Sequence, residues 1–229
     1  MAQCKEPDMP VPVYLWCTQS IAAMDISMIH RRRHLILFAR APRLGVGKSR
    51  LARDIGRLQA WRFYRGNLQT MIRRLQAGPW TLTIAVATQE DVTHPAFAGL
   101  PVMVQPSGDL GVRMSGILRQ MPPGPAIIIG SDIPGIQSHH IHQAFNTLGT
   151  SDALFGPADD GGYWLAGLAR RRPVPYGFMR NVPWSTQGAL TATLAALPTD
   201  MRVGFLDTLS DIDDGASYAT YLKEGGRAR

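Results

Sequence analysis

The stretch Ala126-Ile127-Ile128-Ile129-Gly130-Ser131-Asp132-Ile133-Pro134 decides the fold. Its run of apolar residues without alternation, opened by a proline and closed by Gly-Ser, predicts a strand that is buried on both faces, as in the centre of a parallel sheet. Asp132 then lies just past the carboxyl end of this strand. Ligands of open α/β sheets bind at that edge, where a carboxylate can hold a divalent cation and, through it, a phosphate. The competing role for Asp132 is a turn or a helix cap.

The whole chain has the size and composition of one α/β domain. Its 229 residues, of which 45% are hydrophobic, can bury one substantial core. The net charge of +7 indicates an anionic partner, and roughly half of the Lys and Arg residues fall between Arg31 and Arg74. No RNA-binding or zinc-finger signature accompanies this basic patch, so we expect a small phosphate ligand and no nucleic acid.

Residues 1–30 are expected to be a poorly ordered amino-terminal extension of a domain that spans residues 31–229. The stretch 9–29 is interrupted by an aspartate, two prolines and polar residues, so we expect no transmembrane segment. Its flank also lacks the charge pattern of a signal peptide. Cys4 and Cys17 are the only cysteines, which indicates neither a disulfide framework nor a zinc site and fits a cytoplasmic protein.

A basic, glycine-containing loop follows the first predicted strand, residues 34–39. The loop runs over residues 40–48, and apolar residues then recur at helical spacing. This order points backbone N–H groups and the positive end of a helix dipole at the loop, so we expect it to bind an anion. Gly47-Lys48-Ser49 ends like a Walker A motif, but Pro42 stands where that motif begins with glycine. An exposed basic turn is the alternative. The side chains that could neutralise an anion are Arg43, Lys48 and Arg50.

Three later loops combine acidic residues or glycines in patterns that suit ligand binding. Gly108 to Gly111 could allow close approach of a flat ligand such as a base, or Asp109 could simply cap a helix. The Asp159-Asp160-Gly161-Gly162 turn could bring a second substrate against the backbone, or be a plain hairpin turn. Asp211-Ile212-Asp213-Asp214 could place two carboxylates on one cation, or cap a helix.

The segment around Trp184 is predicted to open a helix. Ser185 or Thr186 would cap this helix, with Leu190 and Leu194 on its buried side. Trp184 is either a core anchor or the wall of an acceptor pocket. The remaining strands are predicted at residues 81–87, 101–105, 152–157, immediately after Gly162, and at 203–206.

The motifs occur in a fixed order along the chain. They are Phe38–Gly45 with Lys48–Leu51, Gly108–Gly111 with Arg113-Met114, Gly130-Ser131-Asp132 with Pro134, Gly156–Ala158 with Asp160–Tyr163, Trp184–Thr186, and Asp211–Asp213. Jointly they resemble the DUF2064 family, bacterial glycosyltransferase-like proteins of the GT-A, or nucleotide-diphospho-sugar transferase, superfamily. The resemblance covers residues 34 to 221. It implies a single α/β GT-A domain, a mixed, mainly parallel sheet with helices on both faces.

The resemblance also implies roles for individual residues. Asp132 and, in preference to Asp211, Asp213 would hold Mg²⁺ or Mn²⁺. Lys48 and Asp160 are our candidate catalytic residues, with the hypothesis that Asp160 orients or deprotonates the acceptor. The implied acceptor-binding residues are Gly161, Gly162, Tyr163 and Trp184. The implied nucleotide-binding residues are Ala39, Arg40, Gly45, Gly47, Lys48, Arg50, Gly108, Asp109, Gly111 and Arg113.

The expected function is therefore metal-dependent transfer from a nucleotide donor, first of all a nucleotide-sugar glycosyltransferase with a small-molecule or glycan acceptor. Ser131-Asp132 lacks the full Asp-x-Asp of many glycosyltransferases, and Ser49 stands where the family commonly has Thr. One alternative is a guanylyl- or uridylyl-type nucleotidyltransferase that acts on a phosphorylated small molecule. The other is a non-catalytic nucleotide-binding module.

Overall fold

A computed structural model describes residues 33–225. The predicted extension 1–30, with Cys4 and Cys17, lies outside the described residues. The centre of the fold is a seven-stranded sheet in the order β3-β2-β1-β4-β6-β5-β7. Its strands are β1 (His34–Ala39), β2 (Thr81–Val86), β3 (Val102–Val104), β4 (Ala126–Gly130), β5 (Ala153–Pro157), β6 (Tyr163–Leu168) and β7 (Val203–Phe205).

The sheet is mixed and mainly parallel, as predicted. β1 pairs in parallel with both β2 and β4, whereas β6 runs antiparallel to its neighbours β4 and β5. The apolar run of the deciding stretch is β4, which lies between β1 and β6. Burial on both faces explains why its isoleucines do not alternate with polar residues.

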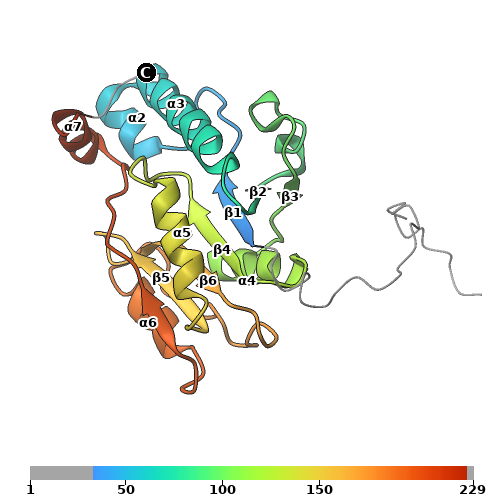
Figure 1. The fold of residues 1–229 in the computed structure, drawn as a ribbon. Coiled ribbons are helices and arrows are strands. Elements are labelled where there is room, and N and C mark those ends of the chain that lie inside the picture. Colours follow the sequence, from blue (N-terminus) through green and yellow to red (C-terminus); the bar gives the residue numbers. More distant parts are fainter. Residues whose placement is uncertain (1–32, 226–229) are drawn as a thin grey trace, which may run out of the picture.

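Helices cover both faces of the sheet (Figure 1). They are α2 (Ser49–Ile55), α3 (Arg57–Gln76), α4 (Leu110–Gln120), α5 (Ser138–Thr147), α6 (Ala189–Ala195) and α7 (Gly215–Lys223). Ile127 and Ile129 of β4 pack in one hydrophobic cluster with residues of α3 and α5. Ile128 belongs to a second cluster that includes α4 and, at its margin, α6. Successive residues of a strand point to opposite faces, so the two clusters are the two sides of the sheet.

The predicted start of the helix after Trp184 is wrong. α6 begins at Ala189, with Gly188 before it and no side-chain cap. Ser185 has a left-handed backbone (φ 61°), and the Thr186 hydroxyl accepts a hydrogen bond from Gly188 N, so this polar pair forms a turn instead of a cap. Leu190 and Leu194 do pack toward the core, as expected.

Helix α7, at the carboxyl end of the described chain, packs against α2 near the other end of the sequence. Helices α2 and α7 lie side by side (Figure 1), and Asp54 Oδ2 accepts a hydrogen bond from Gly215 N at 2.7 Å. Ile212, just before α7, is buried in a small cluster with Leu51 and Phe63. This packing brings the late acidic loop against the loop that follows β1. Among residues 33–225, no helix combines the length and the apolar character that crossing a membrane requires.

Candidate active site

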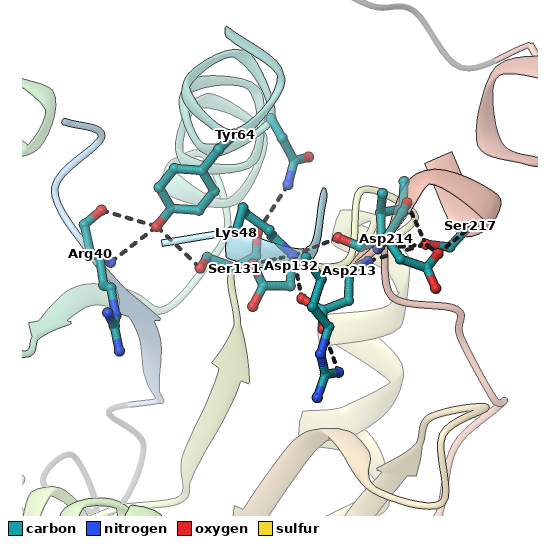
Figure 2. Close-up of polar contacts among 11 residues, drawn as sticks. Arg40, Lys48, Tyr64, Ser131, Asp132, Asp213, Asp214 and Ser217 are labelled. Atoms are coloured by element: carbon teal, nitrogen blue, oxygen red, sulfur yellow. Dashed lines mark hydrogen bonds and ion pairs between the residues drawn. The ribbon is translucent and has the colours of Figure 1, made fainter. Parts of the chain in front are cut away.

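The loop after β1 has a left-handed backbone at three positions. Gly45, Gly47 and Lys48 have φ angles of 84°, 74° and 49°. Glycine adopts this region freely, whereas a lysine there is uncommon. The left-handed turn at Lys48 ends the loop directly before α2, and the side chain reaches the residues that follow β4 (Figure 2).

Lys48 is the centre of a charge cluster at the carboxyl edge of the sheet. Its Nζ lies 2.9 Å from Asp132 Oδ1 and 3.7 Å from Asp213 Oδ1, and it donates a hydrogen bond to the Ile212 carbonyl at 2.5 Å. Arg50 adds a second cation, 3.0 Å from Asp213 Oδ2. The Lys48 side chain is 7% exposed, whereas the Asp132 and Asp213 side chains are 49% and 43% exposed. The two predicted metal residues therefore meet at one buried ammonium group.

The backbone holds the two acidic loops together. Ile212 N donates a hydrogen bond to the Asp132 carbonyl at 3.1 Å. Asp214 turns the other way and caps α7, where it accepts a hydrogen bond from Ser217 N at 2.8 Å. Of the two roles open for this loop in the sequence, Asp213 thus takes part in the charge cluster and Asp214 is the helix cap.

A hydrogen-bond network fixes the ends of β1 and β4 relative to each other. The Tyr64 hydroxyl of α3 donates to the Arg40 carbonyl and accepts from Arg40 N, both at 3.0 Å, and lies 3.4 Å from the buried Ser131 Oγ (Figure 2). Asn67 also donates to the Ser131 carbonyl. Burial raises the pKa of Tyr64 to about 12, so the group is a neutral hydroxyl at physiological pH. Ser131 therefore has a structural partner, and Asp132 beside it is the residue that faces the charge cluster.

Asp132 and Asp213 suit a divalent cation that is shared with a ligand. Both carboxylates lie within 4 Å of one point, which Lys48 Nζ occupies, and carboxylate oxygens are ligands that Mg²⁺ and Mn²⁺ prefer. Within residues 33–225, no group of three or more His, Cys, Asp or Glu side chains could hold a metal ion. Mg²⁺ is commonly bound by one or two carboxylates, with waters and substrate phosphates completing its shell. The residues fit that arrangement if Lys48 moves aside.

A cavity of about 480 Å³ lies against the charge cluster, between the end of β1, the residue after β3 and the start of α4. The predicted nucleotide-binding residues that line it are Ala39, Arg40, Gly47, Lys48 and Arg113. Gln105 also lines it and donates to the Ala85 carbonyl at 2.8 Å. Sequence reasoning missed Gln105, although a polar residue just past a strand at the ligand-binding edge was the available signal. Arg50 lines the neighbouring cavity instead.

Gly45, Gly108, Asp109 and Gly111 do not line that cavity. Asp109 caps α4, accepting a hydrogen bond from Val112 N at 2.8 Å. A Cβ on Gly111 would lie 1.8 Å from the Met179 carbonyl oxygen. Gly111 therefore allows the backbone at Met179 to pack closely against α4, and this close approach does not involve the cavity.

A second cavity, of about 760 Å³, continues from the charge cluster toward β6 and the segment before α6. The predicted acceptor residues Gly162, Tyr163 and Trp184 line it, together with Asp160. Gly161 does not, because its backbone packs against Gln187, where a Cβ would lie 2.4 Å from the carbonyl oxygen. Four further polar residues line it, and sequence reasoning gave none of them an acceptor role: Ser185, Thr186, Gln187 and Asp211.

Asp160 and Asp211 bring two further carboxylates to this second cavity. Burial, and next the nearby negative charge of Asp160, raise the pKa of Asp211, while the positive charge of Lys48 opposes the shift. Asp160 is exposed and accepts a hydrogen bond from Gly162 N at 2.9 Å, within the turn that joins β5 to β6. The predicted hairpin turn is real, and it also directs a carboxylate to the cavity.

Arg43 does not join the cluster. Its Nη1 lies 2.5 Å from Oδ1 of the buried Asp91, whose Oδ2 accepts from Ala41 N at 3.2 Å. The guanidinium thus ties the loop after β1 to Asp91, and Arg43 does not line the cavity beside the charge cluster.

The fold is that of the nucleotide-diphospho-sugar transferases. A candidate nucleotide-diphospho-sugar transferase from Desulfovibrio desulfuricans G20 is 25% identical, with a TM-score of 0.71 over 80% of this chain and 82% of that chain. The inositol-1-phosphate CTP transferase from T. maritima is 14% identical, with a TM-score of 0.54 over 86% and 98%. Glucosyl-3-phosphoglycerate synthase from Mycobacterium tuberculosis, in complex with Mn²⁺, UDP and glucosyl-3-phosphoglycerate, is 12% identical, with a TM-score of 0.51 over 90% and 83%.

The chain belongs to the DUF2064 family, whose description is "Uncharacterized protein conserved in bacteria" and whose model matches residues 70–186. No curated protein sequence matches the chain. The family and the fold expected from the motifs are thus confirmed.

Proposed function

We propose that this protein is a metal-dependent transferase that uses a nucleotide donor, first of all a nucleotide sugar. The observation that carries the proposal is the meeting of Asp132 and Asp213 at Lys48, between the two cavities. Acidic groups from distant loops that face one cationic position, at the carboxyl edge of an α/β sheet, suit a metal that bridges donor phosphates.

The donor would lie in the cavity of about 480 Å³, where Arg40 and Arg113 offer positive charge. Asp132 and Asp213 would hold Mg²⁺ or Mn²⁺, and the bound ion would neutralise phosphate charge and stabilise the departing group. Lys48, released from its carboxylate partners, would present a second positive charge close to the same position. One fold relative is seen with Mn²⁺ and UDP, which agrees with this arrangement.

The acceptor would lie in the cavity of about 760 Å³. Asp160 would orient or deprotonate its hydroxyl, and Tyr163 and Trp184 would shape the apolar part of the pocket. Because Asp160 is exposed and makes a local hydrogen bond to Gly162 N, it can change partner when an acceptor binds.

Nucleotidyl transfer is the second candidate function. Gly130-Ser131-Asp132 lacks the full Asp-x-Asp of many glycosyltransferases, because Gly130 stands two positions before Asp132. A fold relative is a CTP transferase, which agrees with this alternative.

A product assay separates the candidates. With Mn²⁺ present, release of a free nucleoside diphosphate from a nucleotide sugar identifies glycosyl transfer, and release of pyrophosphate from a nucleoside triphosphate identifies nucleotidyl transfer. Asp160→Asn should lower turnover by about 10²-fold or more with donor affinity unchanged, the usual contribution of an acid-base group. The matched control is Asp159→Asn, next in the chain, whose side chain accepts from Ser210. Metal-dependent nucleotide binding without turnover on a broad acceptor panel would support a non-catalytic module instead.

A further inference from the structure

A third cavity lies on the far side of the loop after β1. It has a volume of about 350 Å³ and is bounded by residues 45–49 of the loop and by the facing sides of α2 and α3. Val46, Gly47, Lys48 and Ser49 line both this cavity and the proposed donor cavity. The two cavities therefore share one segment of backbone.

The charge that lines this third cavity is positive. Arg53 of α2 and Arg57 of α3 both line it, and no Asp or Glu among residues 33–225 does so. A Cβ on Gly45 would lie 3.8 Å from Arg57 Nη2, so the guanidinium rests beside the loop backbone. Trp61 forms an aromatic wall of the cavity, and its indole N–H donates a hydrogen bond to the Pro42 carbonyl at 2.8 Å.

Arg53 and Arg57 carry positive charge that no carboxylate among residues 33–225 pairs with, unlike Arg43 and Arg50. Arg43 and Arg50 are each paired with an aspartate. Within residues 33–225, neither Arg53 nor Arg57 has an ion pair or a side-chain hydrogen bond. Two unpaired guanidinium groups at a concave site offer up to ten N–H donors in planar forks, a geometry that matches phosphate oxygens.

We propose that the cavity between residues 45–49, Arg53 and Arg57 is a second anion site, which binds a phosphate or pyrophosphate group without the metal. The group has two possible sources: the distal phosphates of a nucleotide whose base lies in the donor cavity, or a separate phosphorylated ligand. The site goes beyond the transferase proposal, because it uses neither Asp132 nor Asp213.

Isothermal titration with inorganic pyrophosphate in the presence of EDTA tests the site. The double variant R53Q/R57Q should weaken pyrophosphate binding at least about tenfold, the effect of losing charge-assisted hydrogen bonds. The matched control R62Q/R73Q removes the same charge from exposed positions of α3 that line none of the three cavities, and should bind like the wild type. All four arginines are exposed, so melting temperatures should agree between the two variants.

The outcomes discriminate clearly. Undetectable pyrophosphate binding by the wild type, equal binding by R53Q/R57Q, or an equal loss in both double variants would each overturn the proposal. If R53Q/R57Q also weakens a nucleoside triphosphate more than its monophosphate, the distal phosphates of the nucleotide are the source. If R53Q/R57Q binds the nucleoside mono-, di- and triphosphates like the wild type but binds pyrophosphate more weakly, the source is a separate ligand. Asp132→Asn should retain metal-free pyrophosphate binding, so failure of the metal site and failure of this site can be told apart.

Discussion

Lys48 Nζ lies 2.9 Å from Asp132 Oδ1, and this ion pair joins the loop after β1 to the loop after β4. The Lys48 side chain is nearly buried. It also contacts Asp213 and the Ile212 carbonyl, so the loop before α7 meets the other two loops at this ammonium group. The ammonium group therefore faces both carboxylates at the position where the proposed function requires a metal ion. A cation that binds there competes with a side chain of this same protein.

Lys48→Met should tighten Mn²⁺ binding in the absence of nucleotide. Removal of the competing ammonium group frees Asp132 and leaves Asp213 paired with Arg50 alone, and we expect Mn²⁺ affinity to rise at least about tenfold by calorimetry. Without metal the same variant should lose about 1–2 kcal/mol of unfolding free energy, less than a fully buried pair would, because the carboxylates are almost half exposed. Mn²⁺ affinity no higher than that of the wild type would show that Lys48 does not compete.

Gly111→Ala should destabilise the protein despite the better helix propensity of alanine. A Cβ at this position of α4 would lie 1.8 Å from the Met179 carbonyl oxygen and 2.8 Å from the Trp184 ring. Overpacking of this kind costs about 1–3 kcal/mol, measurable by urea denaturation. Gly135→Ala is the control, since a Cβ there meets nothing within 4 Å. Equal unfolding free energies of the two variants would contradict this prediction, because they would show that the backbone around Met179 moves aside at no cost.

Asp152→Asn should reduce stability at neutral pH by about 1 kcal/mol. The Arg202 backbone N–H, 3.0 Å from Asp152 Oδ2, holds the pKa of this carboxyl below its usual range. The carboxyl of Asp152 thus has a lower pKa in the folded protein than in the unfolded chain. Its contribution to the unfolding free energy is complete at pH values above the unfolded pKa, and it is lost as the pH falls through the folded pKa. The difference in unfolding free energy between the wild type and Asp152→Asn should therefore become smaller below about pH 4. Glu90→Gln, at an 86% exposed side chain, should show almost no effect, and a pH-independent gap for Asp152→Asn would refute the assignment.

The fold could be predicted because the strands differ clearly from their surroundings. The uninterrupted apolar run of β4 indicated a central strand, and the order of the motifs identified the family. The start of α6 could not be predicted, because Ser185 and Thr186 look like helix caps but form a turn that depends on a left-handed backbone. Local sequence does not show which of two local structures such residues adopt.

The site was predictable only to the level of the loops. Asp132 and Asp213 come together because Ile212 is buried against α2 and α3, a tertiary contact that no local pattern reveals. The same limit applies to Gly111, whose close neighbour is the Met179 backbone, and to Arg43, which pairs with the buried Asp91. In each case the residue type was informative, but its partner lies in a distant part of the sequence.

The metal site is tested by a Mn²⁺ titration that is followed by electron paramagnetic resonance, with UDP, GDP, CDP and ADP added in turn. The wild type should bind Mn²⁺ together with at least one of these nucleotides. Asp132→Asn and Asp213→Asn should each weaken that binding about tenfold or more, whereas Asp200→Asn, at an exposed residue paired with Arg172, should not. Mn²⁺ binding that is unchanged in either of the first two variants would contradict a metal site shared by Asp132 and Asp213.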